Sequence, residues 1–244
     1  MLHSHRPSAR LRQSARRARL TGVSEIVRPR STVRPHASAS APSFWERISS
    51  VFAPKESPEA AERKRLRQVS AELRELITAG EEEGQAAADL PRVNQLLDEL
   101  IASGDAGLPF DEESIGGGPW VVRFTRGKPF LWDITWNTSK IANSRNRASQ
   151  DFNPAAGRTA LNKVELNGPD SFISAAGTYE PVDDSAVTPK AIRANIRSGR
   201  LVAWGLDVPL PIAGSGLFEV VFVDEQVGLR VFRSSGRYAV QVRP

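Results

Sequence analysis

Cysteine is absent from the chain, and histidine occurs only at His3, His5 and His36. From residue 37 onward, this excludes disulfide bonds, zinc fingers and thiol nucleophiles. It equally excludes Ser-His-Asp triads and histidine-ligated metals. An enzyme built on that part would have to work with carboxylates, Lys, Tyr or Ser. The sequence therefore predicts no metal site, no cofactor and no catalytic residue.

Long apolar runs are also absent. No segment approaches the roughly 18 apolar residues that a membrane-spanning helix needs, so we expect a soluble or peripheral protein. Acids are scarce at one end: residues 1–40 hold nine Arg, no Lys and a single acid, Glu25. Subtracting the +8 of that segment from the net charge of +5 leaves −3 for residues 41–244. An acidic body repels phosphate, so the sequence predicts no nucleic-acid partner.

The first 40 residues have the composition of a targeting segment. They are rich in Arg and Ser, poor in acids, and lack the apolar run of a secretory signal. This composition is typical of an organelle transit peptide, and we expect cleavage around residues 37–41. Composition alone does not separate a chloroplast signal from a mitochondrial one. The alternative is a disordered basic arm.

Residues 41–56 predict a short amphipathic helix and a linker. Ser43 and Glu46 match a capping box, in which the two side chains satisfy backbone N–H groups at the start of a helix. Five apolar residues then fall on one face of two turns: Phe44, Trp45, Ile48, Val51 and Phe52. Two interpretations stay open, a helix packed on the domain and an aromatic anchor on a lipid surface.

Two longer amphipathic helices are expected within residues 57–104. The first begins at Ser57-Pro58, an N-cap residue followed by proline, and ends near Gly80. The second covers about residues 89–103. The basic cluster 63–67 is interleaved with acids at helical spacing, which favours a solvated, ion-paired face over a nucleic-acid patch. The apolar stripes are Leu66, Val69, Leu73, Leu76 and Ile77, then Val93, Leu96, Leu97, Leu100 and Ile101.

From Pro119 onward the apolar period changes from 3.6 to 2. Short alternating segments separated by Gly, Pro, Asn and Asp predict about nine strands with no helix between them. This is typical of an antiparallel sandwich or barrel, and gives a mainly β (α+β) fold. The predicted strands are 120–125, 130–136, 160–166, 171–179, 191–196, 201–206, 217–223, 229–233 and 238–242.

The predicted strands raise two questions about binding residues. Trp120, Trp132 and Trp136 serve a packed core or an apolar cavity equally well, and the last two share a face by strand parity. Arg230 and Arg233 stand on opposite faces of their strand, so in a closed barrel one of them projects inward. An inward arginine could form a salt bridge, with Asp224 or Glu225 for Arg230, or bind the polar head of a ligand.

Several motifs occur in a characteristic order. Two amphipathic helices precede G-x-W-x-V-x-F-T-R-G at residues 118–127, and LVAWGLDVPLPIAGSG follows at 201–216. The chain then continues through Asp224 to L-R-V-x-R at 229–233 and a final apolar strand. Over residues 65–243 this resembles a divergent member of the plastid lipid-associated protein (fibrillin) family.

The resemblance implies a lipocalin-like antiparallel β-barrel over residues 116–244 after helices 57–104, in a single domain 57–244. It also implies a chloroplast protein at plastoglobules or thylakoids, or in the stroma, with 1–40 as its transit peptide. We therefore expect a non-catalytic protein that binds prenylquinones, carotenoids or fatty acids. A ligand-free barrel used as an interaction or assembly module is one alternative. An enzyme that acts on lipid is the other.

Overall fold

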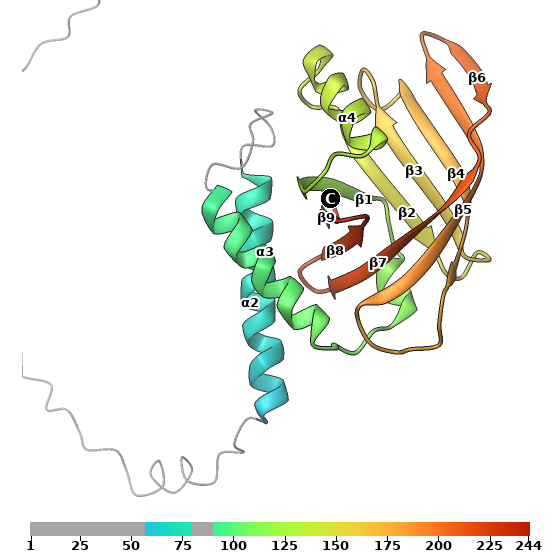
Figure 1. Cartoon of the computed structure of the whole chain (residues 1–244). Helices are drawn as coiled ribbons and strands as arrows, with labels where there is room; N and C mark the ends of the chain where they lie inside the picture. The colour runs from blue at the N-terminus through green and yellow to red at the C-terminus, as the bar shows by residue number, and fades with distance from the viewer. Residues whose placement is uncertain (1–56, 80–89) are drawn as a thin grey trace, which may run out of the picture. The chain divides into compact units, whose positions relative to one another are not determined.

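The computed structural model of the chain describes residues 57–79 and 90–244 (Figure 1). The predicted transit peptide (1–40) and the predicted helix of 41–56 lie outside these residues and stay predictions. The described residues belong to one compact unit and are mainly β, with two long helices preceding nine antiparallel strands. The predicted α+β class with helices first is therefore confirmed.

Helices α2 (Pro58–Thr78) and α3 (Leu90–Asp105) are the two predicted amphipathic helices. Ser57 caps α2 as expected, because its Oγ accepts a hydrogen bond from the N–H of Ala60 at 3.1 Å. Nearly all the predicted stripe residues are buried and form one core cluster with the outer face of β7, β8 and β9. The sheet contributes Val221, Phe222, Leu229, Val231, Val240 and Val242 to that cluster.

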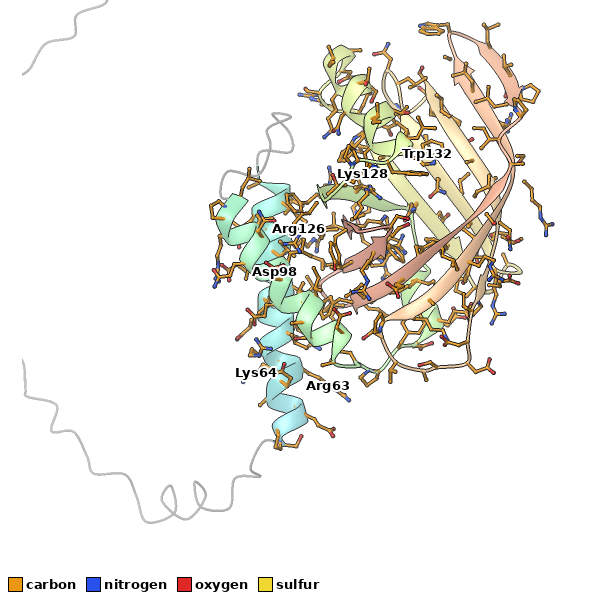
Figure 2. All side chains as sticks on the ribbon, in the orientation of Figure 1. Arg63, Lys64, Asp98, Arg126, Lys128 and Trp132 are labelled. Carbon is orange, nitrogen blue, oxygen red and sulfur yellow. The ribbon has the colours of Figure 1, made fainter. Side chains whose placement is uncertain are left out.

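Ion pairs hold the two helices to each other and to the sheet. Arg92 on α3 donates from Nε and Nη2 to the Glu72 carboxylate on α2, at 2.7 Å each. Asp98 on α3 pairs with Arg126 at 2.7 Å, and Figure 2 shows these two side chains between the helix and the sheet.

The basic cluster of α2 faces solvent, as predicted. Arg63 and Lys64 are exposed (Figure 2), and Arg65 forms an ion pair with Glu62 at 2.6 Å. One turn of a helix separates Arg65 from Glu62, which is the spacing that the sequence indicated. The cluster is therefore a solvated helix face.

The nine strands form one antiparallel sheet that closes into a ring. The order is β4-β3-β2-β1-β9-β8-β7-β5-β6, and a further pairing of β4 with β5 closes the ring. β6 stands outside the ring, beside the second half of β5. The strands are β1 Trp120–Arg126, β2 Ala148–Asn153, β3 Thr159–Glu165, β4 Phe172–Pro181, β5 Lys190–Ala203, β6 Leu206–Leu210, β7 Gly214–Asp224, β8 Leu229–Ser234 and β9 Arg237–Val242.

One predicted strand is wrong. Residues 130–136 begin helix α4 (Leu131–Ala142). The Asp133 carboxylate accepts the N–H of Phe130 at 2.8 Å, which satisfies a backbone donor at the helix start. Trp132 and Trp136 still share a face, because a spacing of four residues suits a helix as well as a strand. The alternation of apolar residues in this segment therefore hid a helix.

Two further differences concern strand number and length. β2 was not predicted, because its inward positions hold Gln150 between Ala148 and Phe152 and break the apolar pattern. The predicted strands 191–196 and 201–206 are mostly one strand, β5, which runs through Gly199 without turning. The absence of a Cβ at Gly199 leaves room for Ile212, whose side chain would lie 2.6 Å from such a Cβ.

Candidate functional site

A cavity of about 310 Å³ lies inside the ring of strands. Its wall is formed by inward side chains of β1, β2, β3, β5, β7, β8 and β9, and the first turn of α4 lines one end. Most of the wall is apolar, which is the usual character of a small-molecule site. The lining includes Val122, Trp132, Ala148, Phe152, Ala160, Val164, Ala194, Ile196, Phe218, Phe232 and Ala239.

Three phenylalanines form an aromatic wall of this cavity. The ring centroid of Phe152 lies 5.5 Å from that of Phe218 and 5.8 Å from that of Phe232. Phe218 and Phe232 meet edge to face at 5.3 Å, and Tyr179 meets Phe152 in the same way at 5.2 Å. Edge-to-face contacts of this kind hold aromatic rings in fixed orientations. One side of the cavity is therefore rigid and apolar.

Arg230 projects inward from β8 and is fully buried behind this wall. Its guanidinium carbon lies 4.4 Å from the ring centroid of Trp120 and 4.7 Å from that of Phe232. Its Nη1 donates to the carbonyl of Ile115 at 2.6 Å, and its Nε donates to Oε1 of Gln241 at 2.7 Å. Burial lowers the pKa of Arg230, but an arginine starts so far above neutrality that it stays protonated.

The expected salt bridge from Arg230 to Asp224 or Glu225 is wrong. Asp224 instead organises the turn after β7, because its Oδ1 accepts the backbone N–H groups of Gln226 and Val227 at 3.0 Å each. Its other oxygen accepts the Ser70 hydroxyl of α2 at 3.0 Å. Arg230 is therefore stabilised by carbonyl oxygens and aromatic faces rather than by a bonded carboxylate.

A chain of side-chain amides connects Arg230 to the cavity. Gln241 on β9 faces Arg230 across the strand pair, and its Nε2 donates to Oε1 of Gln150 on β2 at 2.6 Å. Both glutamines line the cavity, whereas Arg230 does not. From Arg230 on β8 to Gln150 on β2 these hydrogen bonds span four neighbouring strands, since β1 lies between β2 and β9. This arrangement places a hydrogen-bonded amide in a largely apolar wall, which also contains Asn162 and the ion pair of Arg237 with Asp133.

Trp132 and Trp136 belong to the cover that α4 makes over the ring. Trp132 lines the cavity and is marked at this end of the ring in Figure 2. Trp136 is buried beside Val122 and Val164, and its Nε1 donates to the carbonyl of Asn146 at 2.9 Å. Of these two tryptophans, Trp132 is therefore the one placed to touch a ligand.

Trp120 lies within the packing around Arg230. It is fully buried, and its Nε1 donates to the carbonyl of Gly116 at 3.0 Å. The guanidinium carbon of Arg243 lies 4.5 Å from its ring centroid, in addition to that of Arg230. Trp120 does not line the cavity. Its position indicates that it supports the arginine rather than a ligand.

Arg233 lies on the outer face of β8, as strand parity requires. Its Nη1 pairs with Asp105 of α3 at 2.9 Å and its Nε with Glu219 of β7 at 2.5 Å. The hydrogen bond with Glu219 is the main reason that the pKa of Arg233 is raised. Arg233 does not line the cavity, so the structure separates it from Arg230.

Gln150, Gln241, Phe152 and Phe218 were missed as site residues. The two glutamines occupy inward positions, where an alternating pattern calls for apolar residues. A polar residue at such a position is a signal in retrospect, because a buried amide needs partners. The sequence did not indicate that both would lie near Arg230, because the pairing of β1 with β2 and β9 brings these strands together and no local pattern predicts it.

The part of the chain that the structure describes contains neither a membrane-spanning helix nor a cluster of metal ligands. No helix in residues 57–79 and 90–244 is long and apolar enough to cross a membrane. In the same residues, no group of three or more Asp, Glu, His or Cys is placed to hold a metal. No protein-family model, curated protein or solved structure matches this chain.

Proposed function

We propose that the ring is a lipocalin-like barrel that binds a hydrophobic metabolite without chemically changing it. The cavity inside the ring is the observation that carries this proposal, because a space lined by Val, Ala, Ile, Phe and Trp side chains favours an apolar molecule. Prenylquinones, carotenoids and fatty acids, or parts of them, have this character. The resemblance to plastid lipid-associated proteins leads us to place the protein in the chloroplast, at a plastoglobule or thylakoid surface or in the stroma.

Filling the cavity should weaken binding of an apolar probe. Ala194 points inward from β5 and lines the cavity, so Ala194→Phe places a ring in the ligand's space. We expect the affinity of the full chain for the fluorescent probe 1-aminoanthracene to fall at least about tenfold, a loss of roughly 1.4 kcal/mol. Fluorescence titration measures this.

The neighbouring residue provides a matched control. Arg193 is exposed on the outer face of β5, where it pairs with Glu180 at 3.3 Å. Arg193→Phe adds the same ring outside the cavity and should leave the affinity unchanged. If the wild-type chain does not bind the probe at all, the carrier function is refuted and the ligand-free interaction module becomes the better proposal.

Exposed apolar side chains support docking at a lipid surface. On α4 and the residue before it, Phe130, Leu131, Ile134 and Ile141 are more than half exposed. The β5–β6 hairpin adds Trp204, 82% exposed, and Leu206. Figure 1 shows α4 and β6 at the same end of the ring. An apolar rim of this kind is typical of a surface that contacts lipid or another protein.

The tip of the hairpin is unusual for a protein that faces only water. Trp204 and Gly205 both have positive φ, 52° and 78°, in the two-residue turn between β5 and β6. Such turns favour Asn-Gly, because a bulky residue at positive φ is strained. A tryptophan held there has its ring available to the headgroup region of a lipid layer, where this side chain is favoured.

Replacing Trp204 with asparagine should separate docking from folding. Asparagine suits the turn better, so we expect stability to stay equal or rise by about 0.5 kcal/mol. We expect binding of the full chain to phosphatidylcholine vesicles, measured by flotation, to fall about tenfold, because burying a tryptophan ring contributes roughly 1.5–3 kcal/mol. Val182 is an exposed apolar residue just after β4, near the start of β5 and therefore far along the strand from Trp204. Val182→Asn is the control. Equal flotation of wild type and Trp204→Asn would refute docking through the hairpin.

A further inference from the structure

The polarity of the amide chain points to the kind of ligand that the cavity takes. We propose that the inner end of the ligand is a neutral carbonyl oxygen, as in a ketone, quinone or ester, held by the side-chain N–H₂ group of Gln150. This inference rests on the proposed function, because it concerns a ligand of the same cavity. It adds a specificity that an apolar wall does not provide.

Arg230 fixes the direction of the hydrogen bonds that run from it through Gln241 to Gln150. A guanidinium only donates, so the atom of Gln241 at 2.7 Å from its Nε has to be the amide oxygen. The amide nitrogen of Gln241 then faces Gln150, where the atom at 2.6 Å has to be an oxygen. The arginine therefore determines which atom of each amide is the oxygen and which is the nitrogen.

The series of hydrogen bonds from Arg230 through Gln241 therefore ends in a hydrogen-bond donor on Gln150. No hydrogen bond joins the Gln150 amide nitrogen to another described residue, and Gln150 lines the cavity. Asn162, its cross-strand partner on β3, also lines the cavity, but its amide can rotate to present either atom. Gln150 is thus held with its N–H₂ group available to an acceptor on the ligand, and Asn162 does not oppose it.

A neutral carbonyl fits this donor better than the other oxygen groups of lipids. A carboxylate would lose its hydration in this cavity, and the two cations of the lining already have partners. Arg237 pairs with Asp133, and Lys163 donates to the carbonyl of Pro169. A hydrocarbon end would leave the donor without any partner, which costs about 1–3 kcal/mol for a buried group. A carbonyl satisfies the donor and brings no proton or charge of its own.

The experiment compares 2-undecanone with undecane, which differ only in the carbonyl oxygen. Both are titrated against the full chain by displacement of 1-aminoanthracene. Wild type should bind the ketone about fivefold more tightly, since one hydrogen bond contributes roughly 1 kcal/mol. Gln150→Glu keeps the shape but ends the chain in an acceptor, so this preference should disappear and 2-undecanol should bind more tightly than the ketone.

Two variants keep the result interpretable. Gln150→Leu removes the donor without adding charge, and it should lower affinity for the ketone while affinity for undecane stays the same or rises. Gln68→Glu makes the same change on the exposed face of α2 and should leave the wild-type preference intact. Equal affinity of wild type for ketone and alkane overturns the inference while the carrier function stands. If 2-undecanone, undecane and 1-aminoanthracene all fail to bind, the carrier function itself is refuted.

Discussion

Replacing Arg230 with alanine is expected to lower the free energy of unfolding by about 4 kcal/mol. The substitution removes a fully buried side chain, so it leaves a cavity between Trp120 and Phe232. It also leaves the carbonyl of Ile115 and the amide oxygen of Gln241 without their donor. Buried acceptors that lose their partner contribute about 1–3 kcal/mol each to such a loss.

The measurement is equilibrium unfolding in urea, followed by tryptophan fluorescence. Arg193→Ala is the control, because that arginine is exposed and its ion pair with Glu180 contributes about 1 kcal/mol or less. Arg230→Met fills much of the space and should recover part of the loss. An Arg230→Ala protein with the same unfolding midpoint as wild type would contradict this supporting role.

The elements that the sequence predicted well are those with one uniform environment. The stripes of α2 and α3 pack against a single surface, so a period of 3.6 appears without interruption. The hairpin β8–β9 alternates between the helices on one side and the ring interior on the other. Its parity placed Arg230 and Arg233 on opposite faces with one of them inward. The structure confirms this and shows that Arg230 is the inward one.

The elements that failed have mixed environments. The first residues of α4 alternate in hydropathy because Phe130 and Ile134 are exposed while Trp136 is buried, so no helical stripe appears. Exposed apolar residues obscure the 3.6-residue spacing by which the buried face of a helix is recognised. The acidic Asp133 near the helix start was the available signal, since a carboxylate in the first turn favours a helix.

The site was predictable only in part for a related reason. Arg230 could be placed on a face, but its partners come from Ile115, Gln150 and Gln241, which lie far from it or from one another in sequence. Hydrogen bonds between distant strands depend on register, which no local pattern fixes. An arginine on an inward face nevertheless implies buried acceptors nearby, and the glutamines at inward positions are the residues that meet this need.

Glycine 104 was expected to lie just past the end of a helix, yet the structure places Gly104 within α3, directly against β7. A Cβ at this position would lie 2.1 Å from the carbonyl oxygen of Val221 and 2.8 Å from Cγ1 of Val221. The contact is with backbone, so a side-chain rotation cannot relieve it. The carbonyl of Gly104 also accepts the Thr188 hydroxyl at 2.8 Å, which fixes the helix end at this distance.

Gly104→Ala is therefore expected to destabilise the full chain by about 3 kcal/mol, because α3 would have to move off β7. For a domain of this size, that corresponds to a fall in Tm on the order of 10 °C. Calorimetry or a fluorescence melt checks it. The sign is informative, since alanine in an unobstructed helix would stabilise it by about 1 kcal/mol relative to glycine.

Gly216→Ala is the matched control for Gly104→Ala. Gly216 lies in β7, the strand that α3 packs against, but no atom lies within 4 Å of a Cβ built there. Alanine should be neutral at that position or stabilise the strand by about 0.5 kcal/mol, because glycine loses more conformational freedom on folding. If both variants melt at the wild-type temperature, α3 does not approach β7 through Gly104. If only Gly104→Ala is destabilised, the close contact between α3 and β7 is established.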